Sequence, residues 1–348
     1  MTATLPSATP DAPEATTPTE RRRRLDTTAI VFLAWIATFV IGYLLVRRDG
    51  GNLTSDANVV KMLTGMSLLG FVAIGQTLAI LCRSLDLSVG YVVAWSSLVA
   101  ATQMKGDDGR VLIAIGAALG LAALVGLANG LIITKLRVNP FIATLGTALM
   151  IKGYLDTKYQ GPAGSVPDSF QEFGYTRVGL VPVSTIVMIV VAFVATLVLR
   201  KTALGYRMFA VGGNDEVARH SGIRTHRTLI AAHVLCSLAA GVAGLLIAAR
   251  YGTGDARVYD DGLDLDSIAA VVLGGTLLLG GRGSVGGTVA GVGILAVLDT
   301  VFDALQVDPF FKDVVRGAVI VVAVALYARR QIDRRSTRQR FTRAGAER

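Results

Sequence analysis

Inside the long apolar stretches of this 348-residue chain, four polar side chains stand out: Gln76, Asn129, His233 and Asp299. A carboxylate in the middle of a membrane-spanning helix costs about 2.5–3.5 kcal/mol on the insertion scale, so Asp299 should face a cavity or a partner. We weigh two interpretations of it, a role on a translocation path and a local pair, for instance with Arg316. His233 is a lone histidine on an apolar helix, which favours a hydrogen-bonded structural residue over a ligand.

A second polar group, Asp86 and Ser88, lies between two apolar runs. Either side chain can cap the helix that follows. Alternatively, a helix break here places a carboxylate and oriented backbone dipoles on a substrate path. Asn139 precedes Pro140, which suits the first turn of a helix and keeps the residue before it extended. The candidate path residues are therefore Gln76, Asp86, Ser88, Asn139, Thr144 and Asp299.

The sequence offers little support for an enzyme. It has no recognisable Ser/His/Asp arrangement and no cluster of metal ligands, and Cys82 and Cys236 fall in apolar segments without ligand spacing. It also lacks the G-x-x-x-x-G-K-[ST] motif, so any ATP and Mg must sit on another subunit. Gly281–Gly286 matches G-x-G-x-x-G, but its neighbours are apolar segments, which favours a tight turn between helices over a cofactor site.

These residues must be held by membrane helices. The chain is 52% hydrophobic and only 17% charged, and it repeats apolar runs of about 20 residues. The net charge of +9 comes from loops and tails, where membrane orientation explains it better than nucleic-acid binding. We expect an all-α, polytopic integral membrane protein with about ten transmembrane or re-entrant helices, at 27–46, 59–82, 88–103, 111–134, 140–154, 180–199, 228–249, 265–279, 285–305 and 310–328.

The basic residues also predict the topology. With ten crossings, most of the 34 lysines and arginines fall on the side of the N-terminus, so both termini are expected in the cytoplasm. Residues 1–26 predict a disordered tail, 27–328 the transmembrane domain and 329–348 a basic tail. The first apolar run is long enough to span and lacks a clear cleavage site, so it predicts an uncleaved helix. Three glycine pairs spaced four apart predict close helix packing: Gly116/Gly120, Gly126/Gly130 and Gly287/Gly291.

The loop 200–227 interrupts the apolar runs and contains a complete short-helix signature. Asn214 is a favoured N-cap, acidic residues follow it, basic residues end the helix, and Gly222 suits the left-handed position after it. Gly212 and Gly213 are expected to let the backbone turn freely before this helix. About two turns of helix are unstable alone in water, so the signature predicts a docking element. Its residues are Gly212, Gly213, Asn214, Asp215, Glu216, Ala218, Arg219, Ser221 and Gly222.

From about residue 59 to 328 the chain resembles the permease subunits of ATP-binding-cassette importers for simple sugars, of the ribose/galactose/xylose type. It is more distantly similar to the branched-chain amino-acid permeases. The motifs that carry the resemblance are Gly75-Gln-Thr-Leu, Leu85–Gly90, Val138–Gly146, Val166–Phe170, Gly212–Ile223, Asp266–Thr276 and Gly280–Ser284.

The resemblance implies alternating access in a bacterial inner membrane, with a second permease copy, an ATPase that holds ATP and Mg, and an extracytoplasmic solute-binding protein. It implies that Gly212–Ile223 couples to the ATPase and that the substrate arrives at the outer loops 155–179 and 250–264. The chain departs from the family at Cys82-Arg83-Ser84 and, with aspartates where asparagine is usual, at Asp299 and Asp303. These departures leave open a different polyol or a modified sugar. An ion-coupled secondary transporter and a branched-chain amino-acid permease remain alternatives.

Overall fold

The computed structural model describes residues 27–308, 310–312, 314–315, 317–318 and 321. The two predicted tails, 1–26 and 329–348, lie outside the described residues. So do most of the last expected apolar segment and Arg316, the suggested partner of Asp299.

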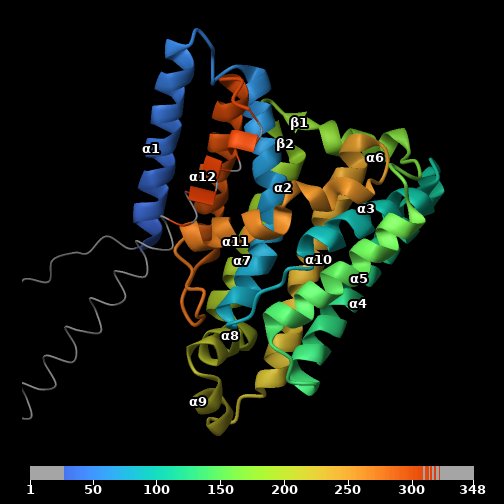
Figure 1. Cartoon of the computed structure of the whole chain (residues 1–348), viewed down its shortest axis with the longest axis vertical. Helices are drawn as coiled ribbons and strands as arrows, with labels where there is room; N and C mark the ends of the chain where they lie inside the picture. The colour runs from blue at the N-terminus through green and yellow to red at the C-terminus, as the bar shows by residue number, and fades with distance from the viewer. Residues whose placement is uncertain (1–26, 309, 313, 316, 319–320, 322–348) are drawn as a thin grey trace, which may run out of the picture.

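The described residues are almost entirely helical, which confirms the all-α prediction (Figure 1). The helices are α1 Thr27–Arg48, α2 Asp56–Leu81, α3 Val89–Met104, α4 Val111–Lys135, α5 Pro140–Lys158, α6 Asp168–Tyr175, α7 Val183–Lys201, α8 Ala203–Gly213, α9 Asp215–His220, α10 Thr225–Tyr251, α11 Leu263–Leu273 and α12 Val285–Ala304. Two 3-10 turns, η1 Asp108–Arg110 and η2 Ala256–Asp261, and a hairpin of β1 Arg177–Val178 and β2 Val181–Pro182 complete the described elements.

Among the described residues, six helices are long and apolar enough to cross a membrane: α1, α2, α4 with η1, α7, α10 and α12. Helices α3 and α11, with 16 and 11 residues, are too short for a full crossing. Helix α5 is longer than predicted and continues to Lys158. An ion pair between Lys152 and Asp156, four residues apart, supports its polar last turns.

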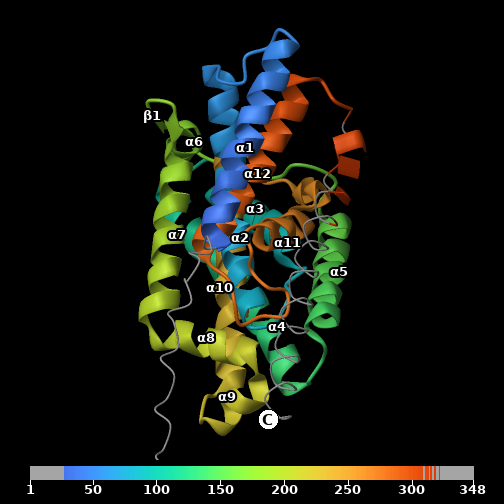
Figure 2. The ribbon, with the colours of Figure 1, turned by 90° about the vertical axis from the view of Figure 1, so that its left-hand side faces the viewer.

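Helices α2 and α10 form the centre of the bundle, and α10 packs against α2, α3 and α4. Their buried faces include Val72, Ile74, Cys236 and Ala240. Helix α1 lies at one side against α12 (Figures 1 and 2) and exposes large apolar side chains over much of its length. An unpartnered apolar face of this kind suits contact with lipid rather than water.

Glycines set the closest helix contacts. A Cβ on Gly126 would lie 2.5 Å from the carbonyl oxygen of His233, so α4 and α10 touch through their backbones. A Cβ on Gly287 or Gly291 would lie 2.1 Å from a carbonyl oxygen of the α11 region. Close packing is therefore confirmed for the Gly126/Gly130 and Gly287/Gly291 pairs. At Gly116 and Gly120 an added Cβ would meet no atom within 4 Å, so the prediction fails within this chain.

Helices α8 and α9 project at one end of the bundle, and α6 and the hairpin lie at the other (Figure 1). The expectation that Gly212 and Gly213 form a free turn is wrong, because both residues belong to the last turn of α8. Helix α6 also lies within a segment expected to be a loop. It is held by tertiary contact, since a Cβ on its Gly174 would lie 2.8 Å from the Ala249 backbone of α10.

The contact between α4 and α10 yields a test with a matched control. Gly126→Ala should destabilise the protein by about 1–3 kcal/mol, because the new methyl group overpacks a backbone contact. Gly116→Ala, on the same helix, should be neutral or stabilising because alanine favours helix and meets open space. Melting temperatures of the purified variants in detergent measure both effects. Equal melting temperatures for the two variants would contradict the packing described here.

Candidate functional site

The chain reverses direction between α2 and α3, over residues 82–88. Helix α2 ends where Arg83 N donates to Ile80 O at 2.9 Å and Ser84 N to Ala79 O at 3.1 Å. Arg83 takes a left-handed conformation, with φ at 64°, and the chain turns back into the bundle. Asp86 and Ser88 are fully buried there. Buried backbone outside a helix needs partners from side chains, because no water reaches it.

Side chains from α2 and α5 supply those partners. Thr144 Oγ1 accepts a hydrogen bond from Leu87 N at 3.1 Å and donates to Leu85 O at 3.2 Å. The Gln76 amide, turned so that both its groups are satisfied, accepts from Asp86 N at 3.2 Å and donates to Asp86 O at 3.3 Å. The backbone of the reversal is therefore tied to the neighbouring helices at three consecutive residues.

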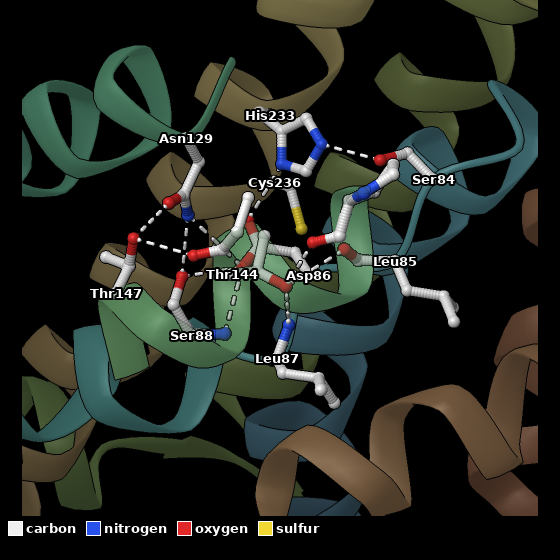
Figure 3. A network of polar contacts seen from close by, with 12 residues as sticks. Ser84, Leu85, Asp86, Leu87, Ser88, Asn129, Thr144, Thr147, His233 and Cys236 are labelled. Atoms are coloured by element: carbon white, nitrogen blue, oxygen red, sulfur yellow. Dashed lines mark hydrogen bonds and ion pairs between the residues drawn. The ribbon is translucent and has the colours of Figure 1, made fainter. Parts of the chain in front are cut away.

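The Asp86 carboxylate is the centre of a buried polar network (Figure 3). Its Oδ1 accepts from Ser88 N at 3.0 Å and from Ser88 Oγ at 2.6 Å. Its Oδ2 lies 3.1 Å from His233 Nδ1, on α10. An unpaired carboxylate at this depth would be strongly disfavoured, and three donors within 3.1 Å compensate for its lost hydration.

His233 joins the carboxylate to the start of the reversal. Its Nε2 lies 2.8 Å from Ser84 Oγ, and the ring is fully buried. Because Nδ1 faces a carboxylate oxygen, Nδ1 carries a proton whether the ring is neutral or charged. In the neutral ring the Ser84 hydroxyl donates to Nε2, and in the charged ring it accepts. The expectation that His233 is a hydrogen-bonded structural residue is confirmed.

Asn129 of α4 and Thr147 of α5 extend the network. Asn129 Nδ2 donates to Ser88 Oγ at 2.9 Å, and Thr147 Oγ1 donates to Asn129 Oδ1 at 2.6 Å. Asn129 lies one turn beyond Gly126, and the close approach of α4 to α10 at that glycine lets both helices reach the reversal. Four helices and the reversal are thus joined through side chains that all lie in the bundle interior.

The structure gathers four of the six candidate path residues at this site: Gln76, Asp86, Ser88 and Thr144. Asn139 is instead the exposed N-cap of α5, where its side chain accepts from Phe141 N at 2.9 Å. Asp299 lies near the far end of α12, and the described contacts of Asp86 do not include it.

Sequence reasoning left Ser84, Asn129, Thr147 and His233 outside the candidate path. Asn129 and His233 carried a signal, as polar residues within apolar runs. Ser84 was marked only as part of the Cys82-Arg83-Ser84 departure from the resembled family. Thr147 carried no signal, because threonine in an apolar helix commonly bonds its own backbone. The prediction that the Ser88 side chain caps α3 is wrong. The Ser88 hydroxyl makes no capping hydrogen bond and instead donates to Asp86 Oδ1.

The predicted short helix is confirmed as α9. Asn214 Oδ1 accepts from Val217 N at 3.1 Å, an Asp215–Arg219 ion pair at 2.6 Å spans the helix, and Gly222 has a φ of 81°. Val217 is 59% exposed, whereas Ala218 is buried against the bundle. Helix α9 therefore presents an apolar residue away from the protein at one end of the molecule.

The end of α8 packs directly on the end of α2. A Cβ on Gly212 would lie 1.7 Å from Leu81 O and 2.5 Å from Gly281 N. Gly281 N itself donates to Leu81 O at 3.0 Å. The tight turn expected at the G-x-G-x-x-G motif is confirmed, with Gly280 and Gly281 at positive φ. Gly212 is thus a close-contact residue, and it touches α2 directly before the reversal that holds Asp86.

Two departures from the resembled family have structural partners. Ser84 bonds His233, as described above. Asp303, at the end of α12, forms ion pairs with Lys61 and Lys312, so its charge is compensated at the protein surface.

Within the described part of the chain, no group of three or more His, Cys, Asp or Glu side chains is placed to hold a metal ion.

Residues 58–324 match the family described as branched-chain amino acid transport system / permease component. Similar proteins include the ribose import permease protein RbsC of Escherichia coli strain K12, 35% identical over 292 residues that cover 82% of this chain and 90% of that protein. RbsC of Bacillus subtilis strain 168 is 37% identical over 273 residues, covering 77% and 84%. The galactose/methyl galactoside import permease protein MglC of E. coli strain K12 is 34% identical over 324 residues, covering 85% and 95%. No solved structure matches the chain.

The Asp86–His233 contact can be tested by a double-mutant cycle. His233→Leu removes the donor of a buried carboxylate and should destabilise the protein by about 3–5 kcal/mol. Adding Asp86→Asn removes the stranded charge, so the double variant should be less destabilised than the sum of the single variants. Melting temperatures of the purified proteins report the coupling. Strictly additive effects would contradict a direct pair.

Proposed function

Because the chain belongs to the family described as branched-chain amino acid transport system / permease component, we propose that it forms the membrane pathway of an ATP-binding-cassette importer for a simple sugar or a polyol. The ribose and galactose permeases among its relatives support a sugar over an amino acid. In this proposal a separate ATPase subunit holds ATP and Mg, and a solute-binding protein delivers the sugar.

The observation that carries the proposal is the position of α9. It is a capped helix too short to be stable alone, and it projects at one end of the bundle (Figure 2). Its Glu216 and Val217 side chains are exposed. Such an element suits a groove on a partner protein. The proposed partner is the ATPase, and the proposed contact residues are the exposed Glu216, Val217 and Arg219 of α9. Gly212 and Ala218 are buried against the bundle, so in this proposal they transmit the movement of α9 and do not touch the ATPase.

The contacts behind α9 offer a route for coupling. Helix α9 follows α8 after Asn214 alone, and Gly212 at the end of α8 touches Leu81 O. If the ATPase displaces α9, the displacement would therefore reach the end of α2 directly, through the contact between the Gly212 and Leu81 backbones. The next residues form the reversal, whose network joins α4, α5 and α10. We propose that this network keeps the helices in one packing and that ATP-driven movement of α9 shifts them to the other.

The topology follows from the same proposal. Helix α9 and both termini lie in the cytoplasm, and α6 and the hairpin lie outside. With the six candidate spans, α3, α5, α11 and the last apolar segment make up the ten transmembrane or re-entrant segments of this proposal. The membrane is the bacterial inner membrane, and the exposed apolar faces meet lipid and a second permease copy.

Transport by the reconstituted complex tests the function. Proteoliposomes that contain the permease, its ATPase and the binding protein should take up labelled ribose or galactose only with ATP. Leucine uptake would favour the amino-acid alternative. Sugar uptake that needs a proton gradient but no ATPase would overturn the proposal in favour of an ion-coupled transporter.

Adjacent glycines give a matched test of the coupling route. Gly212→Ala should reduce sugar-stimulated ATP hydrolysis at least tenfold, because its methyl group would collide with Leu81 O. Gly213→Ala should stay within about twofold of the wild type, since its Cβ meets open space. Hydrolysis and uptake are measured on the same proteoliposomes. A Gly212→Ala complex with unchanged hydrolysis would remove the α8–α2 contact from the coupling route.

A further inference from the structure

A second polar cluster lies at the other end of α5 from the Asp86 network. Asp156 Oδ2 pairs with Lys152 Nζ at 3.1 Å, and the Tyr259 hydroxyl of η2 donates to Asp156 Oδ1. Lys152 Nζ also lies 3.2 Å from the Tyr259 hydroxyl and 4.4 Å from the centre of its ring. Tyr91 of α3 stacks on Tyr259, with ring centres 5.1 Å apart and planes at 19°. Three elements thus present aromatic and charged groups together.

A cavity of about 300 Å³ adjoins this cluster. Its lining residues are Asp156, Tyr159, Gln160, Gly161, Ala256, Arg257 and Tyr259. Gln160 and Arg257 are exposed, and their side chains form no hydrogen bond or ion pair with a described residue. Asp156 is 47% exposed, so its carboxylate can accept further hydrogen bonds. The cavity therefore offers a guanidinium and an amide that make no side-chain hydrogen bond to a described residue, beside a carboxylate that is already bonded to Lys152 and Tyr259 but still half exposed.

Backbone hydrogen bonds fix the two chain segments that line the cavity, so the cavity is formed without a ligand. Ala163 N donates to Gly254 O at 2.8 Å and Gly254 N to Ala163 O at 3.1 Å, which ties the loop after α5 to the segment before η2. Asp255 Oδ1 accepts from Arg257 N at 2.9 Å and fixes the start of η2. The bond to Asp156 and burial raise the pKa of Tyr259, so its hydroxyl stays protonated at neutral pH. Preorganised groups lose less entropy when a ligand binds.

The ion pair itself explains little of this arrangement. Exposed pairs such as Lys152–Asp156 contribute only about 0–1 kcal/mol to stability. Asp156 and Arg257 are the charged residues of the cavity lining, so the lining carries no net charge and does not favour a charged ligand. An aromatic wall beside a carboxylate, a guanidinium and an amide suits a neutral ligand with an apolar face and several hydroxyl groups. The volume is at the low end of ligand pockets, about 300–1,000 Å³, which suits a single sugar ring.

We propose that this cavity, lined by Asp156, Gln160, Arg257 and Tyr259, is a receiving subsite for one neutral monosaccharide or polyol released by the binding protein. The proposal rests on the proposed function, which puts this end of the molecule outside the membrane. Asp156 accepts from the sugar hydroxyls, Arg257 and Gln160 donate to them, and the half-buried Tyr159 of the cavity lining covers one face of the sugar ring. Thr144 and Thr147 of the Asp86 network lie on the same helix, about 18 Å and about 14 Å from Asp156 along its axis.

The double variant Gln160→Ala/Arg257→Ala tests the subsite, because both side chains are exposed and their loss should leave the fold intact. In the full importer with saturating sugar-loaded binding protein, we expect uptake to fall about tenfold and the sugar transported per ATP to fall with it. Arg177→Ala is the matched control, an exposed arginine at the same end of the molecule that does not line the cavity. It should transport like the wild type.

The outcomes separate the subsite from other roles. Unchanged uptake would overturn the proposal. A higher concentration of binding protein for half-maximal ATP hydrolysis, without loss of sugar per ATP, would make the cavity a protein-docking contact and would also overturn it. Saturation-transfer NMR of ribose and galactose with the purified permease gives a readout independent of transport. Transfer to the wild type but not to the double variant supports the subsite even if the complete importer moves neither sugar.

Discussion

A buried carboxylate at a chain reversal is the constraint on which the rest of the structure depends. Residues 82–88 leave the helical hydrogen-bond pattern in the bundle interior, and Asp86 adds a charge there. Both the backbone and the charge need partners, because hydration is lost. Gln76, Thr144 and His233 supply them from α2, α5 and α10, and Ser88 supplies them from the reversal itself. Since each partner must come within about 3 Å, the positions of α2, α5 and α10 are fixed together around the backbone and the carboxylate of the reversal.

Glycine contacts make this convergence possible and extend it to the end of the molecule. Gly126 brings the backbone of α4 onto α10, so that Asn129 and His233 reach the same reversal from two helices. Gly212 brings α8 onto Leu81, five residues before Asp86. Contacts between backbones cannot be absorbed by a change of rotamer. Backbone contacts thus connect the exposed helix α9 to the buried network, which supports the coupling route that we propose.

Local signals in the sequence predicted the local structure well. The capped helix α9, the turn at Gly280 and Gly281 and the proline-started α5 follow from residue types at fixed spacings, and the structure has all three. Helix α8 was not predictable in this way, because its glycines indicate a turn and only their fit against Leu81 and Gly281 explains them. The residues that bond Asp86 could not be predicted from the sequence either. Thr147 and Ser84 look ordinary in sequence, and their role depends on which helices meet.

The central claim is that side chains, not helix geometry or lipid, satisfy backbone groups of Leu85, Asp86 and Leu87, beyond the last hydrogen bonds of α2. Hydrogen–deuterium exchange of residues 82–90 in lipid nanodiscs tests it most directly, with Thr144→Val beside Thr196→Val, a threonine whose hydroxyl bonds only its own helix. The account predicts that the wild type and Thr196→Val protect this segment as strongly as α2, and that Thr144→Val exchanges at Leu87 at least tenfold faster. Equal protection in all three proteins would contradict it.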